Sequence, residues 1–197
     1  MPSRRKFIQS SAIALSIPSL LPISGAAKNI GPDKNYKKAF LKLGMAGYTF
    51  VNYSIDQTIA MMNRVAIDNL SVKEFHLPLD SSQEKINEVL AKFKGGGINV
   101  YAVGVIYMKS QAEVDRAFDY AKRVGVELIV GVPTYDLLNY TEKKVKSYNI
   151  RIAIHNHGPE DKLYPGPKDV YDRIHKMDKR VGLCLDIGHA FRAGADL

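Results

Sequence analysis

The feature that most constrains the fold is a regular alternation of short apolar runs and longer amphipathic segments. The repeat is 24 to 31 residues long, which is the length of a strand followed by a helix. Strands separated by helices pair in parallel. The pattern therefore predicts one α/β domain built from consecutive strand-helix units. The apolar runs begin near Lys42, Ser71, Ile98, Val126, Ile150 and Val181, with spacings of 29, 27, 28, 24 and 31 residues.

Helix signals fall between these runs. Serines at 81, 82 and 110 precede two apolar stripes with helical spacing, and glycines at 95–97 and 125 follow them. Ile55 and Ile59 mark one further helix, and Pro167 marks the first turn of another. The pattern between Leu137 and Ser147 is weaker but also fits a helix.

The two faces of the predicted strands differ in character. In an open doubly wound sheet both faces meet helices, so the strands are aliphatic throughout. Here one face is expected to pack on helices and the other to converge on a barrel interior. The aliphatic face holds Leu41/Leu43/Met45, Leu128/Val130/Val132, Ile150/Ile152/Ile154 and Val181/Leu183/Leu185. The small or polar face holds Gly44/Ala46/Tyr48, Val72/Glu74/His76, Ala153/His155 and Gly182/Cys184/Asp186.

These faces predict a (β/α)8 TIM barrel, incomplete here. A flavodoxin-like or Rossmann sheet is the alternative, but no G-x-G-x-x-G follows the first predicted strand. A (β/α)8 barrel typically needs about 250 residues, whereas this chain has 197. About five and a half βα units fit, so we expect a fragment of a longer reading frame. Such a chain would expose the edges of its first and sixth strands, hold at most half a site and be inactive by itself.

The N-terminal segment predicts export. Residues 1–27 contain no acidic residue and pass from Arg4-Arg5-Lys6 through an apolar run to small residues at 24–27. This order resembles a twin-arginine signal peptide, which implies a periplasmic protein. A membrane anchor is the alternative, but the run is shorter than the roughly 20 residues that cross a bilayer and holds two prolines. The predicted organisation is signal peptide 1–27, linker 28–40 and partial barrel 41–197, with no stable membrane insertion after cleavage.

The positive charge does not indicate a nucleic-acid partner. The net charge is +8, and signal cleavage, which removes Arg4, Arg5 and Lys6, lowers it to +5. Most of the remaining cations lie at predicted helix C-termini, where they complement the helix dipole. Only Lys109, Lys162 and Arg192 fall on the loops that would surround an active site, too few for a DNA-binding rim or a sugar phosphate. The single cysteine excludes an intrachain disulfide and a thiolate zinc cluster.

Four of the five histidines (His76, His155, His157 and His189) and the carboxylate of Asp186 fall at the ends of the predicted strands. His155 and His157 share one face at the end of the fifth strand, and Asp186 and His189 follow the sixth. Adjacent parallel strands would bring these groups within a few ångströms of each other, where they could share a divalent ion. Packing without a ligand is the alternative.

The first two strands contribute less specific candidates. Glu74 and His76 are expected to lie inward at the end of the second strand, while Leu77 packs outward. Glu74 could instead be satisfied by a neighbour such as Arg151. Tyr48 could line a pocket or cap the barrel.

At these residues the chain resembles the sugar phosphate isomerase/epimerase superfamily, the xylose isomerase-like barrels. The matching motifs are Val72-Lys73-Glu74-Phe75-x-x-Pro78-x-Asp80, His155-Asn156-His157 and Asp186-Ile187-Gly188-His189. The resemblance implies a divalent metal (Mn²⁺, Mg²⁺ or Zn²⁺) that holds substrate oxygens while an acidic residue moves a proton next to a carbonyl. It also implies that Asp186 is a metal ligand and that His189 contacts substrate or metal. His155 stands where epimerases carry a glutamate that is both ligand and base.

We therefore expect a metal-dependent isomerase or epimerase that acts on a sugar, keto-sugar or sugar acid, with lyase or dehydratase chemistry left open. In this hypothesis the metal ligands are His155 and Asp186, and the catalytic residues are His155 and Glu74. The substrate-binding residues are Tyr48, His76, His157 and His189. The competing class is a non-catalytic sugar-binding protein, and an endonuclease IV-like nuclease is disfavoured by the charge distribution. The expected partner is a small carbohydrate, with a homo-oligomer left open.

Overall fold

A computed structural model describes residues 41–196 of the chain. Its centre is one sheet of six strands, all parallel, in which the order across the sheet is the order along the chain. A doubly wound sheet reverses its strand order at a switch point, and this sheet does not. The strands are β1 (Met45–Ala46), β2 (Asn69–Val72), β3 (Asn99–Met108), β4 (Leu128–Pro133), β5 (Arg151–His155) and β6 (Val181–Cys184).

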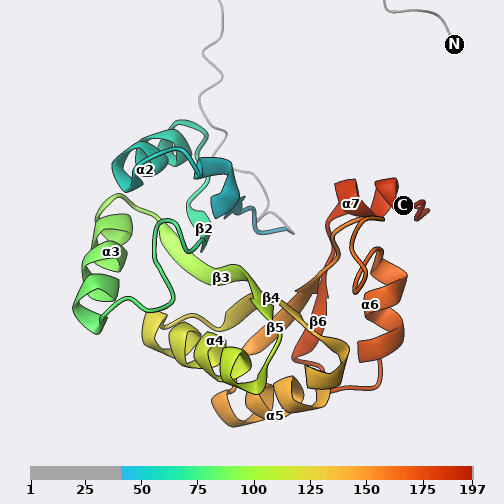
Figure 1. Cartoon of the computed structure of the whole chain (residues 1–197). Helices are drawn as coiled ribbons and strands as arrows, with labels where there is room; N and C mark the ends of the chain where they lie inside the picture. The colour runs from blue at the N-terminus through green and yellow to red at the C-terminus, as the bar shows by residue number, and fades with distance from the viewer. Residues whose placement is uncertain (1–40, 197) are drawn as a thin grey trace, which may run out of the picture. The chain divides into compact units, whose positions relative to one another are not determined.

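Helices connect the strands and lie along the outer side of the curved sheet. In Figure 1 they follow one another around the strands from α2 to α6, while the opposite side of the sheet carries no helix layer. This arrangement is the partial barrel that the sequence predicts. The helices are α2 (Ile55–Arg64), α3 (Gln83–Gly95), α4 (Gln111–Val124), α5 (Leu138–Tyr148), α6 (Pro167–Ile174) and α7 (Ile187–Arg192), with 3-10 turns at Gly47–Phe50 and Tyr135–Leu137. None of the helices within 41–196 is both long and apolar enough to span a bilayer.

The predicted helix boundaries are confirmed by their caps. The side chains of Ser82 and Ser110 accept hydrogen bonds from the Lys85 and Glu113 amides at the starts of α3 and α4. Gly125 ends α4 with a φ of +79°, a left-handed conformation that glycine adopts without a steric penalty. All six strands begin within three residues of the predicted positions.

The hydrophobic core lies between the sheet and its helices. Ile129, Ile152 and Ile154 are fully buried there, together with Phe93 of α3 and Phe118 of α4. This layer holds the strands in a fixed order, so that their carboxyl ends form one rim.

The predicted faces of two strands are wrong. In β4, Val130 faces the interior of the barrel and Ile129 packs under the helices, because this strand is apolar on both faces and its period-two pattern carries no contrast. In β2, Ser71 and Lys73 face the interior while Val72 is buried on the helix side. The strand ends at Val72, so the inward alternation does not continue through the following turn.

The outer faces of the two edge strands are more exposed than predicted. Leu43 beside β1 is 67% exposed and Leu183 in β6 is 37% exposed, because no helix among residues 41–196 covers them. Within these residues β1 and β6 each pair with one strand only. The predicted signal peptide at 1–27 and linker at 28–40 lie outside the described residues.

Candidate active site

An open cavity of about 690 Å³ lies on the interior side of the sheet. Most of its polar lining comes from the carboxyl ends of β1, β2, β3, β5 and β6, which is where active sites of β/α barrels are built. The side chains in its wall that carry an ionisable group are Tyr48, Lys73, Tyr101, Tyr107, His155, His157, Cys184, Asp186 and His189.

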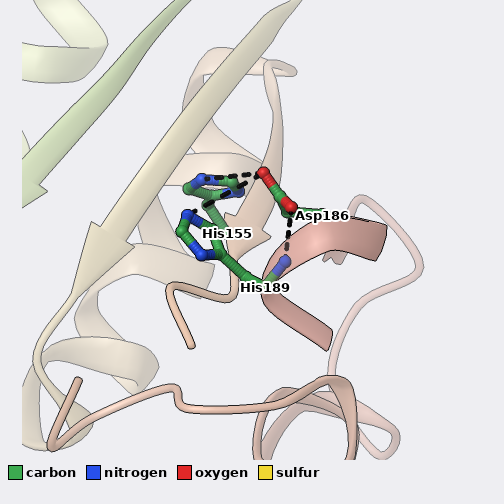
Figure 2. A group of neighbouring side chains, drawn as sticks. All are labelled: His155, Asp186 and His189. Atoms are coloured by element: carbon green, nitrogen blue, oxygen red, sulfur yellow. Dashed lines mark hydrogen bonds and ion pairs between the residues drawn. The ribbon is translucent and has the colours of Figure 1, made fainter. Parts of the chain in front are cut away.

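His155, Asp186 and His189 converge on one point of this cavity. Their candidate ligand atoms all lie within 4.8 Å of one another (Figure 2). The Nε2 atoms of His155 and His189 are each 4.0 Å from Oδ2 of Asp186. The structure thus brings together three of the residues predicted at the strand ends. His189 joins the two predicted metal ligands, whereas the sequence hypothesis gave it a substrate contact and the resemblance allowed either role.

Local structure explains why these three side chains meet. Asp186 is the N-cap of α7, and its Oδ1 accepts a hydrogen bond from the His189 amide at 2.8 Å. The cap therefore places His189 one turn away on the same side. Across the strand boundary, the fully buried Asn156 accepts from the Asp186 amide at 2.9 Å and donates to the Asp186 carbonyl at 3.1 Å. This amide bridge ties the end of β5 to the end of β6.

His157 forms a second polar group beside the first. Its Nε2 is hydrogen bonded to the Tyr107 hydroxyl at 3.0 Å, and the two rings stack with centroids 5.4 Å apart. Its Nδ1 is buried and lies 3.8 Å from Oδ2 of Asp161. The His155 and His157 rings are 4.3 Å apart between centroids, so a group held by one is within reach of the other.

Burial determines the charge state of the two β5 histidines. Desolvation lowers the pKa of His155 and, as a smaller effect, the neighbouring His157 lowers it further. Desolvation also lowers the pKa of His157, against the opposing charge of Asp161. For Asp186, burial by itself would raise the pKa, but the His189 amide and the nearby imidazoles together hold the pKa of the carboxyl below its usual value. Burial thus favours neutral imidazoles at His155 and His157, while Asp186 stays a carboxylate, and these are the states in which such groups bind metal.

Two predicted site residues do not reach the cavity. Glu74 lies exposed in the turn after β2, so the prediction that it lies inward is wrong. His76 is also outside the cavity wall: its Nε2 lies 2.8 Å from the Tyr53 carbonyl oxygen, and its ring packs between Phe75 and Phe93. Both errors have the same two causes. The inward face of β2 is that of Ser71 and Lys73 rather than that of Val72, and the strand ends at Val72, four residues before His76.

Three contributors to the site escaped the sequence prediction. Lys73 was passed over because Glu74 was assigned the inward position. Tyr107 is the penultimate residue of the long strand β3, which was not among the strand ends with predicted site residues. Asn156 carries a usable signal: it alternates with two inward histidines, and a polar residue at such an outward, buried position requires hydrogen-bond partners.

Comparison with known proteins finds no protein-family model and no curated protein that matches the sequence. Among solved structures, a protein of Parabacteroides distasonis ATCC 8503 is 26% identical over 79% of this chain and 67% of that one, with a TM-score of 0.65. A xylose isomerase domain protein from Alicyclobacillus acidocaldarius is 15% identical over 78% of this chain and 66% of that one, with a TM-score of 0.56.

A third match is 3-keto-D-glucoside 4-epimerase, YcjR, from E. coli, 14% identical over 68% of this chain and 64% of that one, with a TM-score of 0.51. The chain has the fold of the xylose isomerase-like TIM barrels. The chain spans about two thirds of the length of each of these solved chains.

The three converging residues fit a single divalent ion. Two imidazoles and a carboxylate form a common donor set for Zn²⁺ and also suit Mn²⁺, whereas Mg²⁺ prefers oxygen donors. Ligand atoms on a tetrahedral ion stand about 3.4 Å apart, given ion-to-ligand distances of about 2.1 Å. The 4.0 Å separations here would close to that value by small side-chain rotations. In addition, the buried Nδ1 of His155 has no hydrogen-bond partner among the described residues.

Proposed function

We propose that this chain carries the metal-binding part of the barrel of a sugar isomerase or epimerase that moves a proton next to a carbonyl group. His155, Asp186 and His189 are the metal ligands in this proposal. The observation that carries it is the convergence of their ligand atoms within 4.8 Å in a cavity at the carboxyl ends of parallel strands. The fold-level similarity to a sugar epimerase supports the same class.

A bound divalent ion would hold the substrate's carbonyl and hydroxyl oxygens and make the neighbouring C–H bond more acidic. The protein's own residues must then take the proton. His155 is occupied as a ligand in this arrangement, so the sequence-based assignment of the base moves to His157. Its imidazole is neutral at neutral pH because burial lowers its pKa, and it can therefore accept a proton.

Tyr107 extends the reach of this base. Its hydroxyl lies 3.0 Å from His157 Nε2, and its ring lines the cavity. A proton leaving the substrate carbon can pass to the Tyr107 oxygen as the phenolic proton passes to His157, while the C–H electron pair remains on the substrate as an enolate. Return of the proton to the neighbouring carbon on the same face, with the hydroxyl proton moving between the two substrate oxygens, would complete an isomerisation. An epimerisation would need a second proton donor on the opposite face. Burial raises the pKa of Tyr107, so the phenol is in its protonated, donating form at rest.

The first test is metal content. The full chain is purified, loaded with Mn²⁺ or Zn²⁺, dialysed and measured by mass spectrometry beside His155→Ala, Asp186→Ala and the control His175→Ala. His175 follows α6 on the surface, away from the cavity, so its loss should leave the metal content unchanged. Unchanged metal in both His155→Ala and Asp186→Ala would reject the site.

The second test separates an enzyme from a sugar-binding protein. The metal-loaded chain is incubated in D₂O with keto-sugars such as fructose, tagatose and psicose, and deuterium at the carbon next to the carbonyl is followed by NMR. Full turnover is not expected of a partial barrel, but exchange needs only the metal ligands and the base. We therefore expect exchange that is lost in His157→Asn, with metal content retained. Ligand-induced thermal stabilisation without any exchange would favour the binding protein instead.

A further inference from the structure

Lys73 occupies a rigid position at the end of β2. Its carbonyl accepts hydrogen bonds from the His76 and Leu77 amides, both at 3.0 Å, which close the turn after the strand. Helix α4 fixes this turn, because the Tyr120 hydroxyl donates a hydrogen bond to the Leu77 carbonyl at 2.7 Å. The lysine side chain therefore starts from a fixed backbone.

The side chain of Lys73 extends along the cavity wall. Its stem packs against Gly47, where an added Cβ would stand only 3.1 Å from the lysine Cγ. Its ammonium donates to the Val105 carbonyl at 3.3 Å and lies 5.9 Å from the centroid of the Tyr48 ring. Both neighbours also line the cavity that contains the candidate metal ligands.

The ammonium of Lys73 has no counter-charge in place. Among residues 41–196 it forms no ion pair, although the side chain is half-buried. Glu74 is the acidic group that most influences it, but that carboxylate is exposed in the turn. An ammonium offers three donors, and the structure uses one of them on a neutral carbonyl. Desolvation accordingly lowers the pKa of Lys73, the expected result for a buried cation without a partner.

We propose that Lys73 binds a carboxylate of the substrate, so that the enzyme acts on sugar acids in preference to neutral sugars. This inference rests on the proposed function for the other end of the substrate, whose oxygens would face His155, Asp186 and His189. The described cavity wall holds one lysine, Lys73, and one carboxylate, Asp186, so a divalent ion would leave the cavity with an excess of positive charge. A monoanionic substrate complements that charge.

A carboxylate fits this position better than a phosphate. Phosphate sites usually combine several cations, a bidentate arginine or the amides at a helix start. The described cavity wall contains one lysine and no arginine. A hydroxyl would leave the half-buried ammonium without a counter-charge, whereas a carboxylate supplies both the charge and two acceptor oxygens.

The test compares matched pairs of ligands that differ only in the acid group. Glucuronate with glucose, galacturonate with galactose and mannuronate with mannose are titrated calorimetrically into the full chain, with and without Mn²⁺. The variants are Lys73→Met, which keeps the length of the stem, and the control Lys109→Met, an exposed lysine at the same rim outside the cavity wall.

We expect at least one uronate to bind about 10- to 100-fold more tightly than its neutral partner, the range for a hydrogen bond to a charged group. That preference should disappear in Lys73→Met and persist in Lys109→Met. No uronate preference in the wild-type chain, or a preference that survives in Lys73→Met, would overturn the proposal. Because binding is scored also without metal, this failure is distinct from that of the proposed function, which metal content and deuterium exchange decide.

Discussion

The amide bridge of Asn156 connects the two strand ends that carry the candidate metal ligands. This buried side chain makes two hydrogen bonds to the backbone of Asp186, at 2.9 and 3.1 Å. They join the last residues of β5 to the start of α7, where Asp186 and His189 are positioned. Replacement by alanine removes both bonds and leaves the Asp186 amide and carbonyl to find other partners.

The expected cost follows from these two bonds. A hydrogen bond contributes about 1 kcal/mol net, so Asn156→Ala should lower the free energy of unfolding by about 2 kcal/mol. For a domain of this size that corresponds to a fall in Tm of about 4–8 °C. Since Asp186 would also lose its support, the affinity for Mn²⁺ or Zn²⁺ should fall about 10- to 100-fold, as it does when groups that orient metal ligands are removed.

Urea unfolding followed by circular dichroism measures the first quantity, and calorimetric titration of the metal measures the second. Asn139→Ala is the matched control, because Asn139 is exposed on α5 and its change should stay within about 0.5 kcal/mol of the wild type. If Asn156→Ala were as stable as this control and bound metal equally well, the amide bridge would not be what holds Asp186 in place.

Three further predictions concern the neighbourhood of the site. Gly47→Ala should destabilise the protein by about 1–3 kcal/mol in urea unfolding, because its Cβ would stand 2.7 Å from a backbone carbonyl of β2, whereas Gly95→Ala has open space and should cost nothing. Tyr107→Phe should slow deuterium exchange about 10-fold or more, because it removes the hydrogen bond to His157. The control Tyr171→Phe changes another tyrosine that stacks on a histidine and should leave the exchange rate unchanged. The free energy of unfolding should fall as pH drops below about 6.5, because the buried imidazoles have pKa values below those of the unfolded chain and protons then favour unfolding. A pH series of urea titrations checks this, and stability that is flat or rises between pH 7 and 5 would contradict it.

Much of the fold could be predicted because its signals are local. Capping serines and terminating glycines mark α3 and α4, and apolar runs mark the strands. The choice of a barrel over a doubly wound sheet also followed from the residues, since β5 and β6 have one apolar and one polar face. For the same reason the inward positions of His155 and Asp186 were predicted correctly.

The errors arose where the local signal is weak or ends early. The face of β4 was inverted because both of its faces are aliphatic, and only packing against the helices distinguishes Ile129 from Val130. Glu74 was placed inward because Val72 was assigned to the interior face and alternation was extended beyond it. In the structure Val72 lies on the helix side, and a turn closed by hydrogen bonds to the Lys73 carbonyl replaces the strand there.

By itself, the sequence determined which residue types stand at the strand ends and in what order, because alternation and helix caps depend on neighbours along the chain. Only the tertiary structure decided which of these side chains meet. The site joins Lys73 after β2, Tyr107 in β3, the histidines at the end of β5 and the Asp186 cap after β6, and their distances depend on strand register, on where each strand ends and on the Asn156 bridge. Those are properties of contacts between residues far apart in the chain, which no local pattern encodes.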